Sequence, residues 1–249
     1  MTKSTALVRA AIGVAVVVLA WAVFWHPSAF VVREHFTSRD PGALSVLFIG
    51  NSQTFVNDLP EMLGELVHAA QPNRALAITD VVRAGARLEE HVKDGTAARA
   101  IARQRWDYVV LQEQSVTPLV WPESFEGAMR ELDTLVHHAG SKTLLFEVWP
   151  LHGVDAGALH ARYVRTASAL GVTLVPVGSA WVRALADDPS LVLFQPDGHH
   201  ATRAGTYLAA CVFYGFVAGA APDGISSLDL PPKLATELQR AARVDVPHG

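Results

Sequence analysis

The sequence predicts an α/β fold built on a parallel sheet, because apolar runs of strand length alternate with helix-like stretches over residues 44–217. The runs are nearly continuous in apolar residues, which is typical of strands buried on both faces of a sheet. Strands are expected at 44–50, 76–83, 108–112, 143–148 and 172–177. Helices are expected at 60–70, 88–104, 123–138, 156–170 and 202–217. This alternation favours right-handed crossovers between parallel strands.

The composition fits one globular domain without a nucleic-acid partner. The chain has 249 residues, of which 50% are hydrophobic and 18% are charged, and its formal net charge is −4. A core of this size needs no disulfides, and no basic stripe supports binding to DNA or RNA. The single cysteine, Cys211, lies in an apolar run, so we expect it to be buried and inert.

Residues 1–25 are expected to form a membrane anchor. Lys3 and Arg9 precede an uncharged stretch that ends in aromatic residues, as at a membrane interface. The stretch is shorter than the ~20 residues that span a bilayer, unless Arg9 snorkels. The domain would then face the periplasm or the cell exterior. Two alternatives stay open: a signal peptide cleaved near 20–22, which would give a secreted protein, and a buried helix of a soluble protein.

Residues 26–42 are expected to be a linker, and residues 43–249 to form the folded domain. The linker contains His26-Pro27 and Pro41-Gly42 among mixed charges, which is typical of irregular chain. The sequence gives no indication of the oligomeric state.

A serine follows the first expected strand in the turn Gly50-Asn51-Ser52. Ligands of parallel α/β sheets bind at the carboxyl ends of the strands, so this serine lies where a nucleophile would be exposed. A serine hydroxyl needs an adjacent base and donors for the oxyanion that forms on attack. The alternative is an ordinary turn with local hydrogen bonds from Asn51 and Ser52.

A carboxylate and a histidine stand just before the last expected helix, as Asp197 and His200. At this spacing the carboxylate can orient the imidazole from its Nδ1 side and leave the other nitrogen to take a serine proton. The alternatives are surface polar residues, a helix cap at Asp197, and a metal site of Asp197, His199 and His200. No established ligand spacing supports the metal site, so no metal is expected.

The segment 46–52 resembles the first block of the SGNH (GDSL-like) hydrolases, and Asp197-x-x-His200 resembles their last block. The resemblance implies a flavodoxin-like, three-layer α/β/α sandwich with a five-stranded parallel sheet. It implies a triad of Ser52, Asp197 and His200. It also implies three oxyanion donors, namely the serine amide, a glycine amide after the second strand and an asparagine side chain after the third.

The glycine of that pattern matches Gly85, but the asparagine has no counterpart. The third strand runs into Leu111-Gln112-Glu113-Gln114, and a glutamine amide can donate the same hydrogen bond. We expect Gln112 to be the third donor, with Gln114 as second choice. This departure, together with Asn51 in place of aspartate before the serine, indicates a divergent branch of the family.

The resemblance implies hydrolysis of a small acyl ester, with an O-acetyl group on a carbohydrate as the expected case and no cofactor. Asn51, Trp149 and His199 are candidates to line the substrate, and core packing is the alternative for Trp149. Two other functions stay open. The same residues could transfer the acyl group to a sugar hydroxyl, or the fold could be a non-catalytic domain that binds a glycan or a partner.

Overall fold

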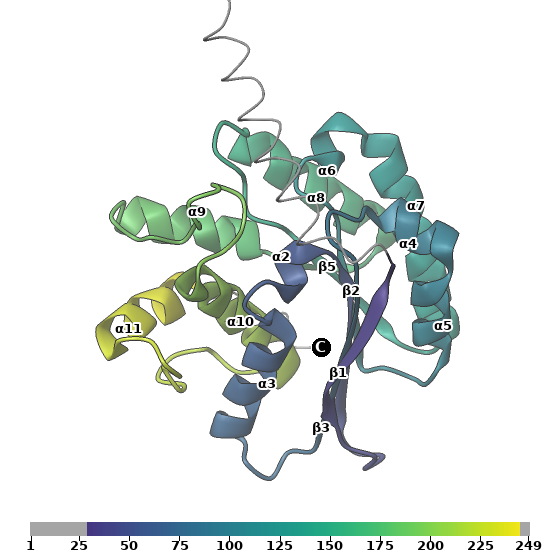
Figure 1. Cartoon of the computed structure of the whole chain (residues 1–249), viewed down its shortest axis with the longest axis horizontal. Coiled ribbons are helices and arrows are strands. Elements are labelled where there is room, and N and C mark those ends of the chain that lie inside the picture. The colour runs from purple at the N-terminus through teal and green to yellow at the C-terminus, as the bar shows by residue number, and fades with distance from the viewer. Residues whose placement is uncertain (1–28, 245–249) are drawn as a thin grey trace, which may run out of the picture.

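The computed structural model describes residues 29–244 and contains a six-stranded sheet covered by helices on both faces (Figure 1). The order of strands across the sheet is β1-β3-β2-β4-β5-β6. The strands are β1 Val31–Thr37, β2 Leu44–Gly50, β3 Leu76–Val82, β4 Tyr108–Gln112, β5 Lys142–Phe146 and β6 Thr173–Val175. Strands β2 to β6 pair in parallel, as predicted. The anchor expected at residues 1–25 lies outside the described residues.

The helices form the outer two layers of an α/β/α sandwich. They are α2 Ser52–Phe55, α3 Leu59–Ala70, α4 Leu88–Asp94, α5 Thr96–Ala102, α6 Thr117–Val120, α7 Pro122–His138, α8 Ala156–Leu170, α9 Val177–Asp187, α10 Arg203–Ala218 and α11 Pro232–Ala241. Figure 1 shows α3 and α10 on one side of the sheet and α4, α5 and α7 on the other. The three-layer architecture predicted from the sequence is confirmed.

The sheet has one strand more than predicted, because β1 lies in the stretch 26–42 that we expected to be a linker. β1 pairs antiparallel with β3 at the edge of the sheet. Its Phe36 ring packs on α3, where a Cβ at Gly64 would lie 2.0 Å from that ring. The expectation was wrong because an edge strand is partly exposed: only Val31, Val32 and Phe36 of β1 are apolar, so it lacks the continuous apolar run of a buried strand.

Two further differences concern the ends of predicted elements. The helix expected at 88–104 is divided into α4 and α5 at Gly95, which adopts a left-handed φ of 77° that ends one helix before the next begins. The strand expected to end at 177 ends at Val175, and α9 begins at Val177.

Helix α10 is buried along nearly its whole length and contains Cys211, whose side chain is fully buried. Burial raises the pKa of this thiol to about 12, which agrees with the prediction of an inert cysteine. Within residues 29–244 no helix is long and apolar enough to cross a membrane.

Candidate active site

The sheet brings three of the predicted site segments to one edge. Strands β3, β2 and β4 are neighbours, and they pair in parallel. Their carboxyl ends therefore lie side by side, with Gly85 after β3, Ser52 after β2 and Gln112 at the end of β4. This is the edge at which parallel α/β sheets bind ligands.

The turn that carries Ser52 is tightly packed. A Cβ at Gly50 would lie 2.4 Å from Gln112 Oε1 and 2.6 Å from Thr54 Oγ1, so only glycine fits at that position. Ser52 is the first residue of α2, and it is 7% exposed. Its backbone amide donates no hydrogen bond to another described residue, which leaves that amide available to an oxyanion.

Asn51 joins three segments at the edge of the sheet. Its amide donates to Gln112 Oε1 at 2.8 Å, and its Oδ1 accepts from the amide of Gln53 at 3.1 Å. Its Nδ2 donates to the carbonyl of Ala86 at 2.9 Å, next to Gly85. Asn51 is 2% exposed and its side chain braces the turn, which argues against our prediction that it lines the substrate.

Gly85 lies where a glycine donor is expected. It is exposed, its φ is 66°, and nothing lies within 4 Å of the position of a Cβ. Among the described residues its amide has no acceptor. The bond from Asn51 to Ala86 fixes the Gly85 turn against the Ser52 turn, so both free amides belong to one braced unit.

Gln112, our first choice for the third donor, is fully buried and its amide is occupied at both ends. Oε1 accepts from Asn51 and from Thr54 Oγ1, and Nε2 donates to Gln53 Oε1 at 3.2 Å and to the carbonyl of Glu113 at 2.5 Å. Both amide hydrogens are therefore used inside the protein. This geometry argues against Gln112 as an oxyanion donor and makes it a structural support of the turn.

Gln114, the second choice, has the opposite arrangement. Its Oε1 accepts from the amide of Val116 at 3.1 Å and from Thr117 Oγ1 at 3.1 Å, which fixes the orientation of the side-chain amide. Its Nε2 has no acceptor among the described residues, and the residue is half-buried. Of the two glutamines, Gln114 alone has a side-chain donor to offer a ligand.

Asp197 and His200 form the hydrogen bond that the sequence predicts. Asp197 Oδ2 lies 2.7 Å from His200 Nδ1. Asp197 Oδ1 accepts from the amides of His199 and His200, both at 2.9 Å. Between them Gly198 adopts a left-handed φ of 67°, which closes the turn. The carboxylate therefore orients the ring through Nδ1 and leaves Nε2 free of this contact.

The electrostatics of this turn keep Asp197 ionised. Burial alone would raise the pKa of Asp197, but the hydrogen bonds from the His200 ring and from two backbone amides lower that pKa below its usual range. The pKa of His199 is lowered because the ring is partly buried and lies beside His200. A charged carboxylate next to an imidazole favours the imidazolium that a general base becomes.

The side chains of Asn57 and Trp149 hold the His200 loop at the sheet edge. Asn57 Nδ2, from the segment that follows α2, donates to the carbonyl of Ala201 at 2.8 Å and to Thr206 Oγ1 at 3.0 Å. Trp149 Nε1, just after β5, donates to the carbonyl of His199 at 3.0 Å. The loop is thus fastened to the Ser52 segment on one side and to the end of β5 on the other.

The hydroxyl of Ser52 makes no hydrogen bond to His200 within the described part of the chain. Nucleophile and base often separate in ligand-free enzymes and approach each other in the substrate complex. The pairing of Ser52 with His200 therefore stays a prediction, supported by the Asn57 connection between their segments.

Trp149 packs in the core. It is 1% exposed, and its ring stacks on Trp181 at 4.6 Å between centroids. This favours core packing over our alternative of a substrate contact. His199 is half-buried, and its ring packs edge-on against the ring of His200 with 4.7 Å between centroids. Of the three substrate-lining candidates, Asn51, Trp149 and His199, only His199 has exposed surface beside the Asp197–His200 pair.

A second group of glutamate, histidine and serine lies beyond β5, but it has the wrong geometry for a triad. Glu147 Oε1 lies 3.0 Å from His160 Nδ1, and Ser179 Oγ lies 3.1 Å from the same nitrogen. A triad needs the acid on one ring nitrogen and the serine on the other. Since both partners meet Nδ1, His160 cannot relay a proton from Ser179.

Three side chains with metal-ligand atoms lie close together between β1, β3 and α3: His35, Asp58 and Asp80. The buried carboxylate of Asp80 already accepts from the Arg33 guanidinium, with an Nε–Oδ1 distance of 3.0 Å. The cluster therefore holds its own cation, and it does not involve the Asp197 loop.

Sequence reasoning missed Asn57 and His91. Asn57 adopts a left-handed φ of 58°, a conformation that asparagine tolerates well, and the Asn-Asp pair was the only available signal. His91, on α4, is buried with Nε2 2.9 Å from the carbonyl of Gly50, so it supports the Ser52 turn from below. Neither contact follows from strand or helix periodicity.

Several solved structures share the α/β/α sandwich of this chain. Among solved structures the chain is similar to a candidate SGNH hydrolase from Slackia heliotrinireducens, with 28% identity and a TM-score of 0.58 over 69% of this chain and 97% of that one. The fold is that of the SGNH hydrolases, which confirms the resemblance found in the sequence. No protein-family model and no curated protein sequence matches the chain.

Structures with lower sequence identity share the fold. A DUF4886 family protein from Bacteroides uniformis is 18% identical with a TM-score of 0.68, covering 80% of this chain and 93% of that one. Axe2, an acetylxylan esterase from Geobacillus stearothermophilus, is 15% identical with a TM-score of 0.57, covering 70% and 94%. These similar structures include hydrolases and esterases, which supports a hydrolase activity for this chain.

Proposed function

We propose that this protein is a serine esterase that removes a small acyl group from an alcohol. The observation that carries the proposal is the 2.7 Å contact between Asp197 and His200 Nδ1, which orients the imidazole as a base. Ser52 is its proposed partner, because it follows β2 at the ligand-binding edge and its segment is bonded to the His200 loop through Asn57.

In this mechanism the Ser52 hydroxyl attacks the ester carbonyl while His200 Nε2 takes its proton. The tetrahedral intermediate collapses, and His200 returns the proton to the leaving alcohol. Water then attacks the acyl-serine, with His200 again as base, and releases the acid. Asp197 stabilises the imidazolium in both halves of the reaction.

The oxyanion is proposed to be bound by the amides of Ser52 and Gly85 and by Nε2 of Gln114. Both amides lack acceptors among the described residues, and Asn51 holds their turns together. Gln114 takes the place that we first gave to Gln112, because the Gln112 amide is fully engaged. Donors fixed before the reaction stabilise the developing charge without reorganisation.

We propose an O-acetyl group on a carbohydrate as the substrate, because one similar structure is an acetylxylan esterase. His199, which packs against the ring of His200, is the residue proposed to contact the substrate. For localisation we keep the proposal that residues 1–25 anchor the domain on the outer side of a membrane, on the strength of the apolar sequence there.

A fluorophosphonate probe tests the nucleophile, with 4-nitrophenyl acetate hydrolysis as the parallel assay. The wild type should be labelled and active, and Ser52→Ala should lose both properties. Ser179→Ala is the matched control, because Ser179 also contacts a histidine and a glutamate, and it should behave as the wild type. An unlabelled wild type would favour a non-catalytic binding domain.

Acetate release from an acetylated glycan, measured with and without a second glycan as acceptor, separates hydrolysis from transfer. Hydrolysis predicts free acetate at a rate that the acceptor does not change. Acetate transferred to the acceptor in place of release would assign the acyltransferase function instead.

A further inference from the structure

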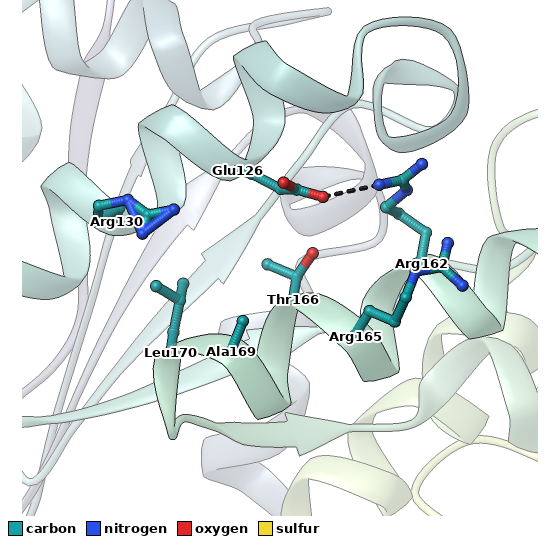
Figure 2. A pocket seen from close by; sticks show the side chains of 7 residues that line it. All are labelled: Glu126, Arg130, Arg162, Arg165, Thr166, Ala169 and Leu170. Carbon is teal, nitrogen blue, oxygen red and sulfur yellow. Dashed lines mark hydrogen bonds and ion pairs between the residues drawn. The ribbon is translucent and has the colours of Figure 1, made fainter.

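Helices α7 and α8 enclose a hollow of about 270 Å³ that none of the proposed catalytic residues lines. Its polar lining consists of Glu126 and Arg130 on α7, and Arg162, Arg165 and Thr166 on α8. Figure 2 shows these side chains around the hollow, with Glu126 joined to Arg162 by a 2.7 Å contact.

The helical spacing places the charged side chains on the facing sides of the two helices. Glu126 and Arg130 are four residues apart on α7, and Arg162 and Thr166 are four apart on α8, so each pair shares a helix face. Three arginines face one glutamate, which leaves the hollow net positive in a chain of formal net charge −4.

Two polar groups in the lining lack partners among the described residues. Thr166 is 3% exposed, and its hydroxyl is buried without a hydrogen bond. Nε of Arg162 is buried and unpaired as well, while its Nη1 is held by Glu126. Buried polar groups normally find a partner, so these two point to a ligand that accepts hydrogen bonds.

We propose that this hollow binds a phosphate group. Guanidinium groups donate to phosphate oxygens in a matching fork geometry, and the buried Thr166 hydroxyl adds another donor. The excess of two positive charges balances a phosphate dianion. The hollow has room for the group and for part of the molecule that carries it, and Ala169 and Leu170 give that part an apolar wall.

The source of the phosphate is either a free phosphate compound or a lipid headgroup, and titrations of the full-length protein separate the two. One arm measures binding of inorganic phosphate by calorimetry, with chloride at equal ionic strength as the blank. The other measures binding to phosphatidylcholine vesicles with and without phosphatidic acid. Binding in the first arm assigns a free phosphate group, and binding in the second arm alone assigns a lipid.

Three variants test whether the hollow is the binding site. Arg165→Gln and Thr166→Val should each raise the dissociation constant by about tenfold, which is the scale of one charge-assisted hydrogen bond. Thr166→Ser keeps the hydroxyl and should restore the affinity. Arg99→Gln is the matched control, because Arg99 is an exposed arginine on α5 outside the hollow.

The proposal is overturned by either of two results. A wild type that binds neither inorganic phosphate above the chloride blank nor phosphatidic acid vesicles more tightly than phosphatidylcholine vesicles has no phosphate site. Equal weakening by Arg165→Gln and Arg99→Gln would mean general electrostatic attraction without a defined site. Thermal unfolding without phosphate shows that Thr166→Val is folded, since removing an unpaired hydroxyl should not destabilise the protein.

Discussion

Asn57 Nδ2 donates to the carbonyl of Ala201 at 2.8 Å and so connects two parts of the chain that are 144 residues apart. Asn57 lies five residues after Ser52, and Ala201 follows His200 directly. The bond therefore spans the gap between the proposed nucleophile segment and the proposed base. We infer that Asn57 sets the approach of His200 to Ser52 without touching the substrate.

Replacing Asn57 by glycine should lower kcat by about ten- to a hundredfold, because small displacements of catalytic groups are costly. Glycine accepts the left-handed φ of 58°, so the backbone stays unstrained while the donor is lost. Fluorophosphonate labelling should slow in parallel with kcat, and KM should change little. Unchanged labelling with normal kcat would show that Asn57 only stabilises the fold.

The two glutamines after β4 should respond differently to alanine. Gln114→Ala should lower kcat by roughly ten- to a thousandfold, as for other oxyanion donors, and it should also cost stability because the Val116 amide and the Thr117 hydroxyl lose their acceptor. Gln112→Ala strands the buried amide of Asn51 and the Thr54 hydroxyl, which costs about 1–3 kcal/mol for each unpaired group. Urea unfolding and steady-state kinetics on both variants check this pair. A loss of kcat of about tenfold or more in Gln112→Ala, with the free energy of unfolding unchanged, would instead favour Gln112 as the oxyanion donor.

The central strands and the Asp197–His200 pair were predictable because each follows from local pattern. Buried parallel strands give continuous apolar runs, and a carboxylate three residues before a histidine reaches it within one turn. The choice between Gln112 and Gln114 was not predictable. It depends on the hydrogen bonds that Gln112 forms with Asn51 and Thr54, which come from another strand end.

The edge strand β1 was missed because half of its residues face solvent and its charges resemble those of a linker. Arg33 reaches the buried Asp80 of β3, a contact between residues 47 apart that no sequence window contains. What could not be predicted was therefore the long-range pairing of polar groups, whereas the apolar runs of β2 to β5 were visible in the sequence.

Arg33→Met should lower the free energy of unfolding by about 3 kcal/mol, because it leaves the fully buried Asp80 carboxylate without its guanidinium. The double variant Arg33→Met, Asp80→Asn removes the stranded charge and should recover part of that loss. Urea unfolding of the wild type and both variants measures the effect. If Arg33→Met is as stable as the wild type, the ion pair of Arg33 with Asp80 does not stabilise the fold.

Burial lowers the pKa of His91 from 6.5 to about 4, so the folded protein keeps this ring neutral at pH values where the unfolded chain binds a proton. Stability should therefore fall as the pH drops from 6.5 toward 4, by on the order of 3 kcal/mol in total.

The variant His91→Gln isolates this contribution, because glutamine can donate to the carbonyl of Gly50 as His91 does but does not titrate. Burial raises the pKa of Glu113 to about 7, which gives a trend of opposite sign: stability falls as the pH rises from 4.5 toward 7. Glu113 is present in both proteins, so its trend cancels in the difference between wild type and His91→Gln. Urea unfolding across this range should show the wild type losing stability relative to the variant as the pH falls. A difference that does not change with pH would mean that His91 binds a proton as readily in the folded protein as in the unfolded chain.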